Sequence, residues 1–244
     1  MRRAIVTGGG RGIGRAVAVA LSKAGHEVTV MGRTEAPLSE AVASGAAKAF
    51  CAVDVSEAEA FSGALLDAGP ADVLVSCAGI ADSAPFLKSD LSLFRRLMAV
   101  NFESIVVGAR AVLPGMIERG FGRIISVASI AGLKGYPYVS AYVASKHAVV
   151  GLTRSLSLEV AKTGVTVNAV CPGYVDTDLV GDNAARIAAR TGRDAAEIKK
   201  EFFKGNPQAR LIRPDEVADA VLWLAGDLAA SVNGQAIAIS GGEA

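Results

Sequence analysis

A tyrosine and a lysine four positions apart, Tyr142 and Lys146, have the types and spacing to move a proton. On a helix, residues i and i+4 share one face, so the ammonium would lie about one turn from the phenol. A nearby positive charge favours phenolate, so we expect the tyrosine pKa to fall from ~10 toward working pH. Tyr142 would then give a proton to a carbonyl oxygen, or take one from an alcohol.

Two further polar residues can serve the same oxygen. Ser129 follows an apolar run, and its hydroxyl can donate a hydrogen bond that stabilises charge developing on a carbonyl oxygen. Asn101 interrupts an apolar helical stretch at residues 98–102, where its amide can bend the helix and hold water near Lys146. With the tyrosine–lysine pair, these residues favour acid–base chemistry on a ketone or alcohol.

A glycine-rich turn, TGGGRGIG at residues 7–14, lies near the start of the sequence. Gly8, Gly12 and Gly14 permit a tight strand-to-helix turn, with backbone close to a pyrophosphate and a helix N-terminus aimed at it. Such a turn alone is often an ordinary loop, but between a strand and a helix it indicates dinucleotide binding. Combined with the proton-transfer pair, it predicts hydride transfer between a nicotinamide and a carbonyl or alcohol.

The end of the second strand bears on the choice of cofactor. An acidic side chain there would bind the adenosine ribose hydroxyls and repel a 2′-phosphate. This chain has Arg33 instead, whose planar guanidinium can pair with phosphate, and Arg11 adds a second positive charge. We therefore expect NADP(H), with NAD(H) the alternative if both arginines are solvated surface charges. Asp54 can accept the adenine amino group or merely cap the next turn.

Short apolar runs alternate with helical patterns along the whole chain. The length and β-branched content of the runs fit strands buried on both faces. The alternation predicts one α/β domain over residues 1–244, a doubly wound (Rossmann) fold with a seven-stranded parallel sheet and helices on both faces. The expected strands are 3–7, 27–31, 47–53, 71–76, 123–127, 165–170 and 235–239, and the expected helices are 13–24, 56–68, 90–118, 141–163 and 214–226.

Composition excludes several classes of function. The charge balance, 25 Lys and Arg against 24 Asp and Glu, leaves no basic stripe for nucleic acid or a membrane surface. We see no apolar run near the ~20 residues that span a bilayer, and a first strand at residue 2 or 3 leaves no room for a signal peptide. The three cysteines lack paired or metal-ligand spacing, so we expect no metal site and a reducing, cytoplasmic compartment.

The motifs, taken in order, resemble the short-chain dehydrogenase/reductase family from the first strand to Gly241-Gly242. The resemblance implies that Asn101, Ser129, Tyr142 and Lys146 form a catalytic tetrad, and that Lys146 also holds the nicotinamide ribose. The motifs are residues 7–14, Cys77-Ala78-Gly79, Asn101, Ser129, Tyr142-x3-Lys146 and Pro172-Gly173-x3-Thr177. The expected cofactor contacts are Gly8, Arg11, Gly12, Ile13, Gly14, Arg33, Asp54, Val55, Ala78, Gly79, Tyr142, Lys146, Pro172, Gly173, Val175 and Thr177, the last at the carboxamide.

The chain departs from the family pattern after the fourth strand. Ser76 and Cys77 stand where the family usually has two asparagines, and Ser126 replaces another common asparagine. We expect altered local hydrogen bonding with catalysis retained.

Within the family, residues 149–156 and 167–173 look most like 3-oxoacyl thioester reductases and polyketide ketoreductases. Residues 178–206 are interpreted as a two-helix lid, with helices at 183–190 and 194–204. A lid of this length also resembles that of 3-hydroxybutyrate dehydrogenases, which bind a free carboxylate with polar and basic residues. The matching positions here are Ala81, Ala131 and Val139, which favour an uncharged ketone or an acyl chain on CoA or a carrier protein.

Three alternative functions and one oligomeric state remain as hypotheses. The chain could be an NAD(H)-dependent secondary-alcohol or 3-hydroxyacyl-CoA dehydrogenase, a non-catalytic nucleotide sensor, or a sugar-nucleotide epimerase, although epimerases are longer and space their glycines differently. The helix at 141–163 is too apolar for open solvent, so we expect it to be buried against another subunit beside helix 90–118. The family's usual homotetramer is consistent with this.

Overall fold

Seven parallel strands form one sheet in the order β3-β2-β1-β4-β5-β6-β7. This computed structural model describes the backbone of residues 1–244 and every side chain except those of Leu179 and Arg190. The strands are β1 (Arg3–Thr7), β2 (Glu27–Gly32), β3 (Ala49–Ala52), β4 (Val73–Ser76), β5 (Gly122–Val127), β6 (Val165–Pro172) and β7 (Ala236–Ile239).

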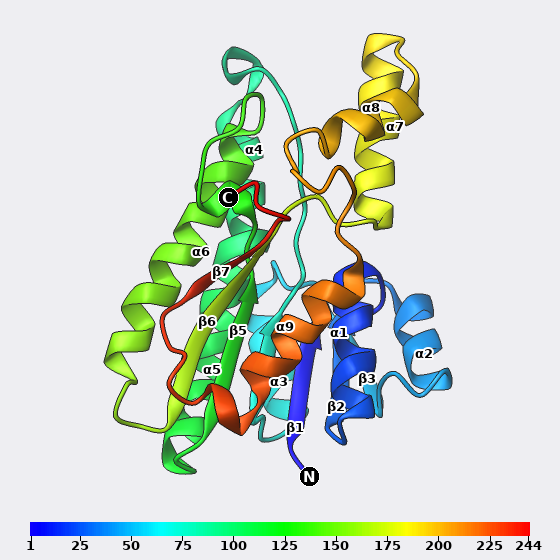
Figure 1. Cartoon of the computed structure of the whole chain (residues 1–244). Helices are drawn as coiled ribbons and strands as arrows, with labels where there is room; N and C mark the ends of the chain where they lie inside the picture. The colour runs from blue at the N-terminus through cyan, green and yellow to red at the C-terminus, as the bar shows by residue number, and fades with distance from the viewer.

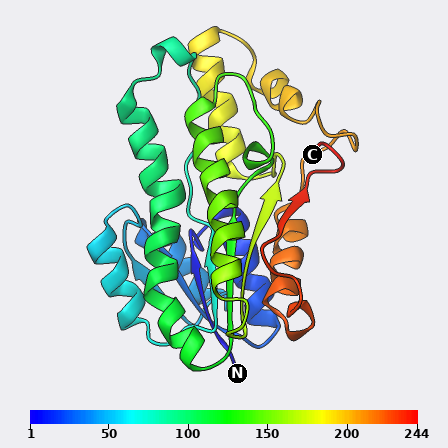
Figure 2. The same cartoon turned by 90° about the vertical axis from the view of Figure 1, so that its left-hand side faces the viewer.

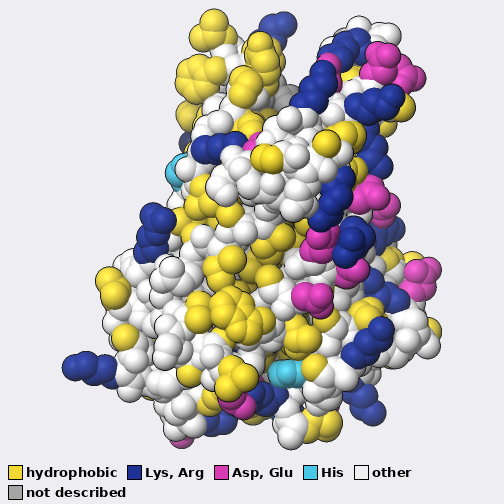
Figure 3. All heavy atoms as spheres, viewed as in Figure 1, with side chains coloured by type: hydrophobic (Ala, Val, Ile, Leu, Met, Phe, Trp, Pro, Cys, Tyr) yellow, Lys and Arg dark blue, Asp and Glu magenta, His cyan; other side chains and the backbone are white. Residues whose placement is uncertain are grey.

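Helices cover both faces of the sheet (Figure 1). One face carries α1 (Gly12–Lys23), α2 (Glu35–Ala43) and α9 (Pro214–Ala225), and the other carries α3 (Ala58–Asp67), α4 (Leu91–Met98), α5 (Ser104–Glu118) and α6 (Ser140–Glu159). Figure 2 shows α5 and α6 running side by side. The pair α7 (Asp178–Thr191) and α8 (Ala195–Phe202) projects beyond the carboxyl ends of the strands, and its surface is dense in charged side chains (Figure 3).

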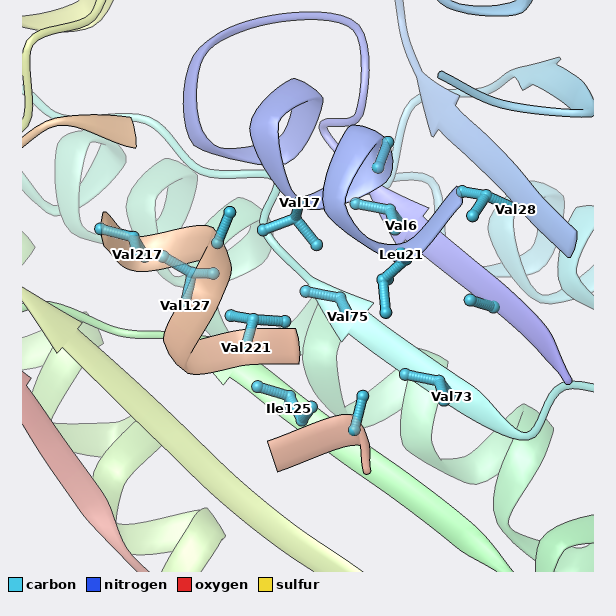
Figure 4. Close-up of a cluster of buried hydrophobic side chains, with 14 of the residues drawn as sticks. Val6, Val17, Leu21, Val28, Val73, Val75, Ile125, Val127, Val217 and Val221 are labelled. Atoms are coloured by element: carbon cyan, nitrogen blue, oxygen red, sulfur yellow. The ribbon is translucent and has the colours of Figure 1, made fainter. Parts of the chain in front are cut away.

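The core has two layers because successive strand residues point to opposite faces of the sheet. Val6, Val75 and Ile125 face α1 and α9, where they meet Val17 and Val221 (Figure 4). The residues between them on the strands, Ile5, Leu74 and Ile124, belong to a second buried cluster with α3 and α5. Burial on both faces explains why the strands appear in the sequence as continuous apolar runs.

The predicted fold class and all seven strands are confirmed, with differences at three helices. The sequence patterns missed α2, a nine-residue helix with only two buried side chains, Leu38 and Ala41. The helix expected at 90–118 contains a π-helical turn, Ala99–Glu103, centred on Asn101. The first helix of the expected lid begins at Asp178 and not at 183, and Gly192, with φ of 71°, ends it.

The segment Leu91–Glu118 is long and apolar enough to cross a membrane by length and composition alone. The expectation that the chain holds no such stretch is therefore wrong in that limited sense. Buried residues of α5, among them Ile105, Ala109 and Met116, pack on the sheet as those of a core helix do, so the stretch is weak evidence for a membrane segment.

Candidate active site

A cavity of about 410 Å³ opens at the carboxyl ends of β1, β4, β5 and β6. It lies where the strand order reverses between β1 and β4, the position at which open parallel sheets bind ligands. It is lined by Gly8, Arg11, Gly12, Ile13, Gly14, Cys77, Ala78, Gly79, Ile80, Ala81, Val127, Ala128, Ser129, Ile130, Ala131, Tyr136, Val139, Tyr142, Lys146, Pro172, Gly173, Tyr174, Val175, Thr177, Asp178, Val180, Asp182 and Asn183.

The glycine turn forms one end of this cavity, and its geometry requires glycine. Gly8 and Gly12 have φ of +68° and +49°, in the left-handed region. A Cβ on Gly14 would lie 2.2 Å from the carbonyl oxygen of Gly8. None of the described side chains caps α1 at Arg11, so the first amides of this helix are available to a phosphate group.

Tyr142 and Ser129 meet at the other end of the cavity. Tyr142 lies in the first turn of α6, and Ser129 is the second residue after β5. The Ser129 hydroxyl accepts the Ala131 N–H at 3.1 Å and lies near enough to the phenol to affect the pKa of Tyr142. Burial raises the pKa of Tyr142 to about 12, although the hydrogen bond from Ser129 lowers it. The phenol is therefore protonated at neutral pH, as a proton donor must be.

Lys146 lies behind the phenol and is only 4% exposed. Its Nζ donates to the Val127 carbonyl at 2.9 Å and lies 5.7 Å from the centre of the Tyr142 ring. Burial lowers the pKa of Lys146 to about 8. The expectation that Lys146 brings the Tyr142 pKa toward neutrality is wrong for this arrangement, because burial of the phenol outweighs the distant ammonium.

Asn101 lies behind the cavity wall and is completely buried. Its Oδ1 accepts the Ile80 N–H at 2.9 Å, and its Nδ2 donates to the Ile80 carbonyl at 2.9 Å and to Ser145 Oγ at 3.1 Å. The predicted bend is present as the π-helical turn. The amide braces the loop after β4 against α6, and the expected water near Lys146 stays a prediction.

The loop after β4 keeps its place without the usual asparagines. The N–H groups of Cys77 and Ala78 both donate to Thr7 Oγ1 at 3.1 Å, which ties the loop to β1. A Cβ on Gly8 would lie 2.9 Å from the Ala78 nitrogen, so the two loops are in close contact. Burial raises the pKa of the Cys77 thiol to about 12, so it enters the cavity as a neutral group.

Three of the expected cofactor contacts, Arg33, Asp54 and Val55, are not among the lining residues. Arg33 is 66% exposed, and its Nη1 lies 3.9 Å from Asp54 Oδ2. Asp54 accepts the N–H and hydroxyl of Ser56 at 2.9 and 2.7 Å, so it caps the following turn. Partial burial raises the pKa of Asp54, but these hydrogen bonds and Arg33 bring it below its usual value. Val55 is buried in the core.

The sequence patterns missed several lining residues, including Tyr174, Asp182 and Asn183. Tyr174 stacks on Phe202 of α8 with ring centres 4.8 Å apart. Its position directly after Pro172-Gly173, at the carboxyl end of β6, was the available signal. The other two lie on α7, whose start was misplaced.

Polar contacts hold the two helices α7 and α8 over the cavity. Arg186 of α7 donates to the Ala81 carbonyl at 3.1 Å and lies 3.7 Å from Asp82. Lys199 of α8 pairs with Asp176 at 2.9 Å. Among the side chains that the structure describes, no group of three or more His, Cys, Asp or Glu is placed to hold a metal ion.

Comparison with known proteins identifies the family. The short chain dehydrogenase model matches residues 2–188. A D-beta-hydroxybutyrate dehydrogenase of Rhizobium meliloti is 36% identical over 99% of this chain and 98% of its own length. An acetoacetyl-CoA reductase of Shinella zoogloeoides is 35% identical over 99% and 98%. The structure of a single-residue variant of actinorhodin polyketide ketoreductase with NADPH superposes with a TM-score of 0.93 at 33% identity, covering 99% of this chain and 97% of that one. The chain belongs to the short-chain dehydrogenase/reductase family and is an oxidoreductase acting on CH–OH groups.

Proposed function

We propose that the protein is an NADP(H)-dependent ketoreductase whose substrate is a 3-oxoacyl thioester or a similarly bulky ketone. The observation that carries this proposal is that Tyr142, Ser129 and Lys146 line the same cavity as the glycine turn. The likeness to an acetoacetyl-CoA reductase and to a polyketide ketoreductase supports the substrate class.

In this mechanism the nicotinamide cofactor, bound along the glycine turn, supplies the hydride. The Tyr142 phenol gives its proton to the substrate oxygen as that oxygen becomes negative. Ser129 donates a hydrogen bond to the same oxygen. Lys146 stabilises the phenolate left behind, and by family resemblance it also holds the nicotinamide ribose while Thr177 contacts the carboxamide. Asn101 holds the loop after β4 against α6.

The substrate end of the cavity favours an uncharged group. Ala81, Ala131 and Val139, which the family resemblance places near the substrate, are among the lining residues. Among the described lining residues, the only cations are Arg11, in the glycine turn, and Lys146, beneath the phenol. Asp182 adds a carboxylate to the wall, which repels a free acid. An acyl chain on CoA or on a carrier protein satisfies these conditions, and so does a neutral ketone.

The assembly and compartment are also part of the proposal. The outer face of α6 carries small and apolar residues beside the exposed His147, Arg154 and Glu159: nothing lies within 4 Å of a Cβ placed on Gly151, and Leu158 is 80% exposed. Such a face suits packing against the same helix of another subunit, beside α5, in a homotetramer. The three free cysteines fit a cytoplasmic protein. We further propose one domain over 1–244, with residues 178–206 as its lid.

Replacing the proposed acid tests the mechanism directly. Tyr142→Phe should lower kcat for ketone reduction by about 10²–10⁴-fold, the usual contribution of a general acid. NADPH binding, measured by fluorescence titration, should persist because the glycine turn is untouched. Tyr138→Phe is the matched control, since that ring is 67% exposed. Full turnover by Tyr142→Phe across a ketone panel would refute the assignment.

The pKa values of the pair predict the pH dependence. Tyr142, with a pKa of about 12, stays protonated, whereas Lys146, with a pKa of about 8, loses its charge in the working range. The rate of reduction should therefore fall above about pH 8, and oxidation, which needs the phenolate, should rise with pH. Initial rates in both directions between about pH 6 and 10 measure this. A reduction rate that rises through pH 8 would contradict it.

The cofactor preference depends on Arg33. We expect the wild type to bind NADPH more tightly than NADH, and Arg33→Ala to weaken NADPH binding by about 10–100-fold, the loss of one charge-assisted hydrogen bond. NADH binding should stay the same. Lys23→Ala is the control, because Lys23 lies at the C-terminal end of α1, away from the glycine turn. Tighter NADH binding by the wild type would favour the NAD(H)-dependent dehydrogenase alternative, to which the hydroxybutyrate dehydrogenase relative is relevant.

Light scattering tests the assembly. The wild type should have four times the monomer mass of 24.8 kDa. Leu158→Asp, which places a charge on the outer face of α6, should lower that mass, because an unpaired charge is costly to bury. Leu66→Asp, at a residue of α3 that is 65% exposed, should not. A monomeric wild type would overturn the proposed tetramer.

A further inference from the structure

The last residues of the sequence fold back against the cavity wall. Residues 240–244 form a turn in which the Ala244 N–H donates to Ser240 Oγ at 3.2 Å. The turn buries the side chain of Glu243, which is 7% exposed. The Tyr136 hydroxyl donates to Glu243 Oε1 at 2.6 Å. Lys134 Nζ lies 3.3 Å from the same oxygen and donates to the Glu243 carbonyl at 2.8 Å.

The opposite side of this turn fits tightly against the segment that follows α8. A Cβ on Gly205 would lie 2.7 Å from Glu243 Oε1, and one on Gly241 would lie 2.1 Å from Asn206 Oδ1. Gly241 also has φ of +65°, which other residues rarely adopt. Glu243 therefore lies between two segments: the loop before α6, which contributes Tyr136 and Val139 to the cavity lining, and the chain that follows α8.

Of the residues in this contact, Tyr136 is the one that lines the cavity; neither Glu243 nor Lys134 does. The hydroxyl of Tyr136 is bonded to the carboxylate, so the ring is the part left to face a bound molecule. Burial and the hydrogen bond to Glu243 both raise the pKa of the Tyr136 phenol, so it remains neutral. Lys134 offsets the charge of the carboxylate.

We propose that Glu243 is a positioning residue for substrate selection: it anchors Tyr136 so that an aromatic surface, not a hydroxyl, forms the wall of the substrate site. The inference rests on the proposed function only in placing a ketone at that end of the cavity. Glu243 makes no contact with Tyr142 or Ser129 among the bonds of the described residues, so it should govern binding of the substrate body and leave proton transfer unchanged.

The test is a double-mutant cycle in which KM and kcat are measured separately for each variant. Glu243→Ala should raise KM for a bulky apolar ketone about 10-fold and leave kcat within about 3-fold. Tyr136→Phe, which keeps the ring but loses the anchor, should have the same effect, and the double variant should add nothing. Glu243→Gln keeps an acceptor oxygen and should rescue most of the loss. Asp227→Ala, which removes a surface partner of Arg2, is the control and should behave as the wild type.

Hydrogen exchange supplies a readout that needs no substrate. Amides of residues 133–139 should exchange faster in Glu243→Ala and Tyr136→Phe than in the wild type. In Glu243→Gln they should exchange at a rate near that of the wild type. If the wild type reduces no ketone, the proposed function fails while exchange still tests the anchor. Unchanged exchange in Glu243→Ala, an unchanged KM, or a full second loss when it is added to Tyr136→Phe would overturn the proposal.

Discussion

The site depends on burying one ammonium group at the end of a parallel sheet. A buried charge is costly unless it is bonded, and Lys146 finds its partner in the Val127 carbonyl, at the end of β5. That bond holds α6 against the end of β5, and Tyr142 lies about one helical turn before Lys146 on the same face of α6. The neighbouring residues must also be small: a Cβ on Gly132 would lie 2.6 Å from the Lys146 carbonyl oxygen, and one on Gly79 would lie 3.3 Å from Asn101 Oδ1.

The same burial sets the protonation states of the pair in opposite directions. Desolvation disfavours the charged form of each group, so the phenol is held neutral while the ammonium is brought toward neutral pH. The expectation that Lys146 lowers the pKa of Tyr142 takes account of the lysine's charge but not of the cost of burying the phenolate. Without substrate, the Ser129 hydroxyl lowers the pKa of Tyr142 and so partly offsets the effect of burial.

Much of the fold was predictable because it rests on local patterns. Buried parallel strands appear as apolar runs, and the glycine turn and the Tyr142–Lys146 spacing are each set within a few residues. The features that were missed depend on contacts between distant segments. The side chain of Asn101 is committed to Ile80 and Ser145, 21 and 44 positions away, and no window of sequence shows that pairing. The short helix α2 has too few buried residues to leave a periodic signal.

The residues that the sequence predicted and those that it missed have different proposed roles in the site. The groups proposed to handle the proton and the phosphates lie at strand ends and on first turns of helices, where backbone geometry limits the residue types that fit. The wall facing the substrate is assembled from the loop before α6, from α7 and from the anchor that Glu243 supplies across 107 positions. Because those segments lie outside the hydrogen-bond ladder of the seven strands, they can change without disturbing the sheet. Substrate choice can therefore vary within this family while the chemistry stays fixed.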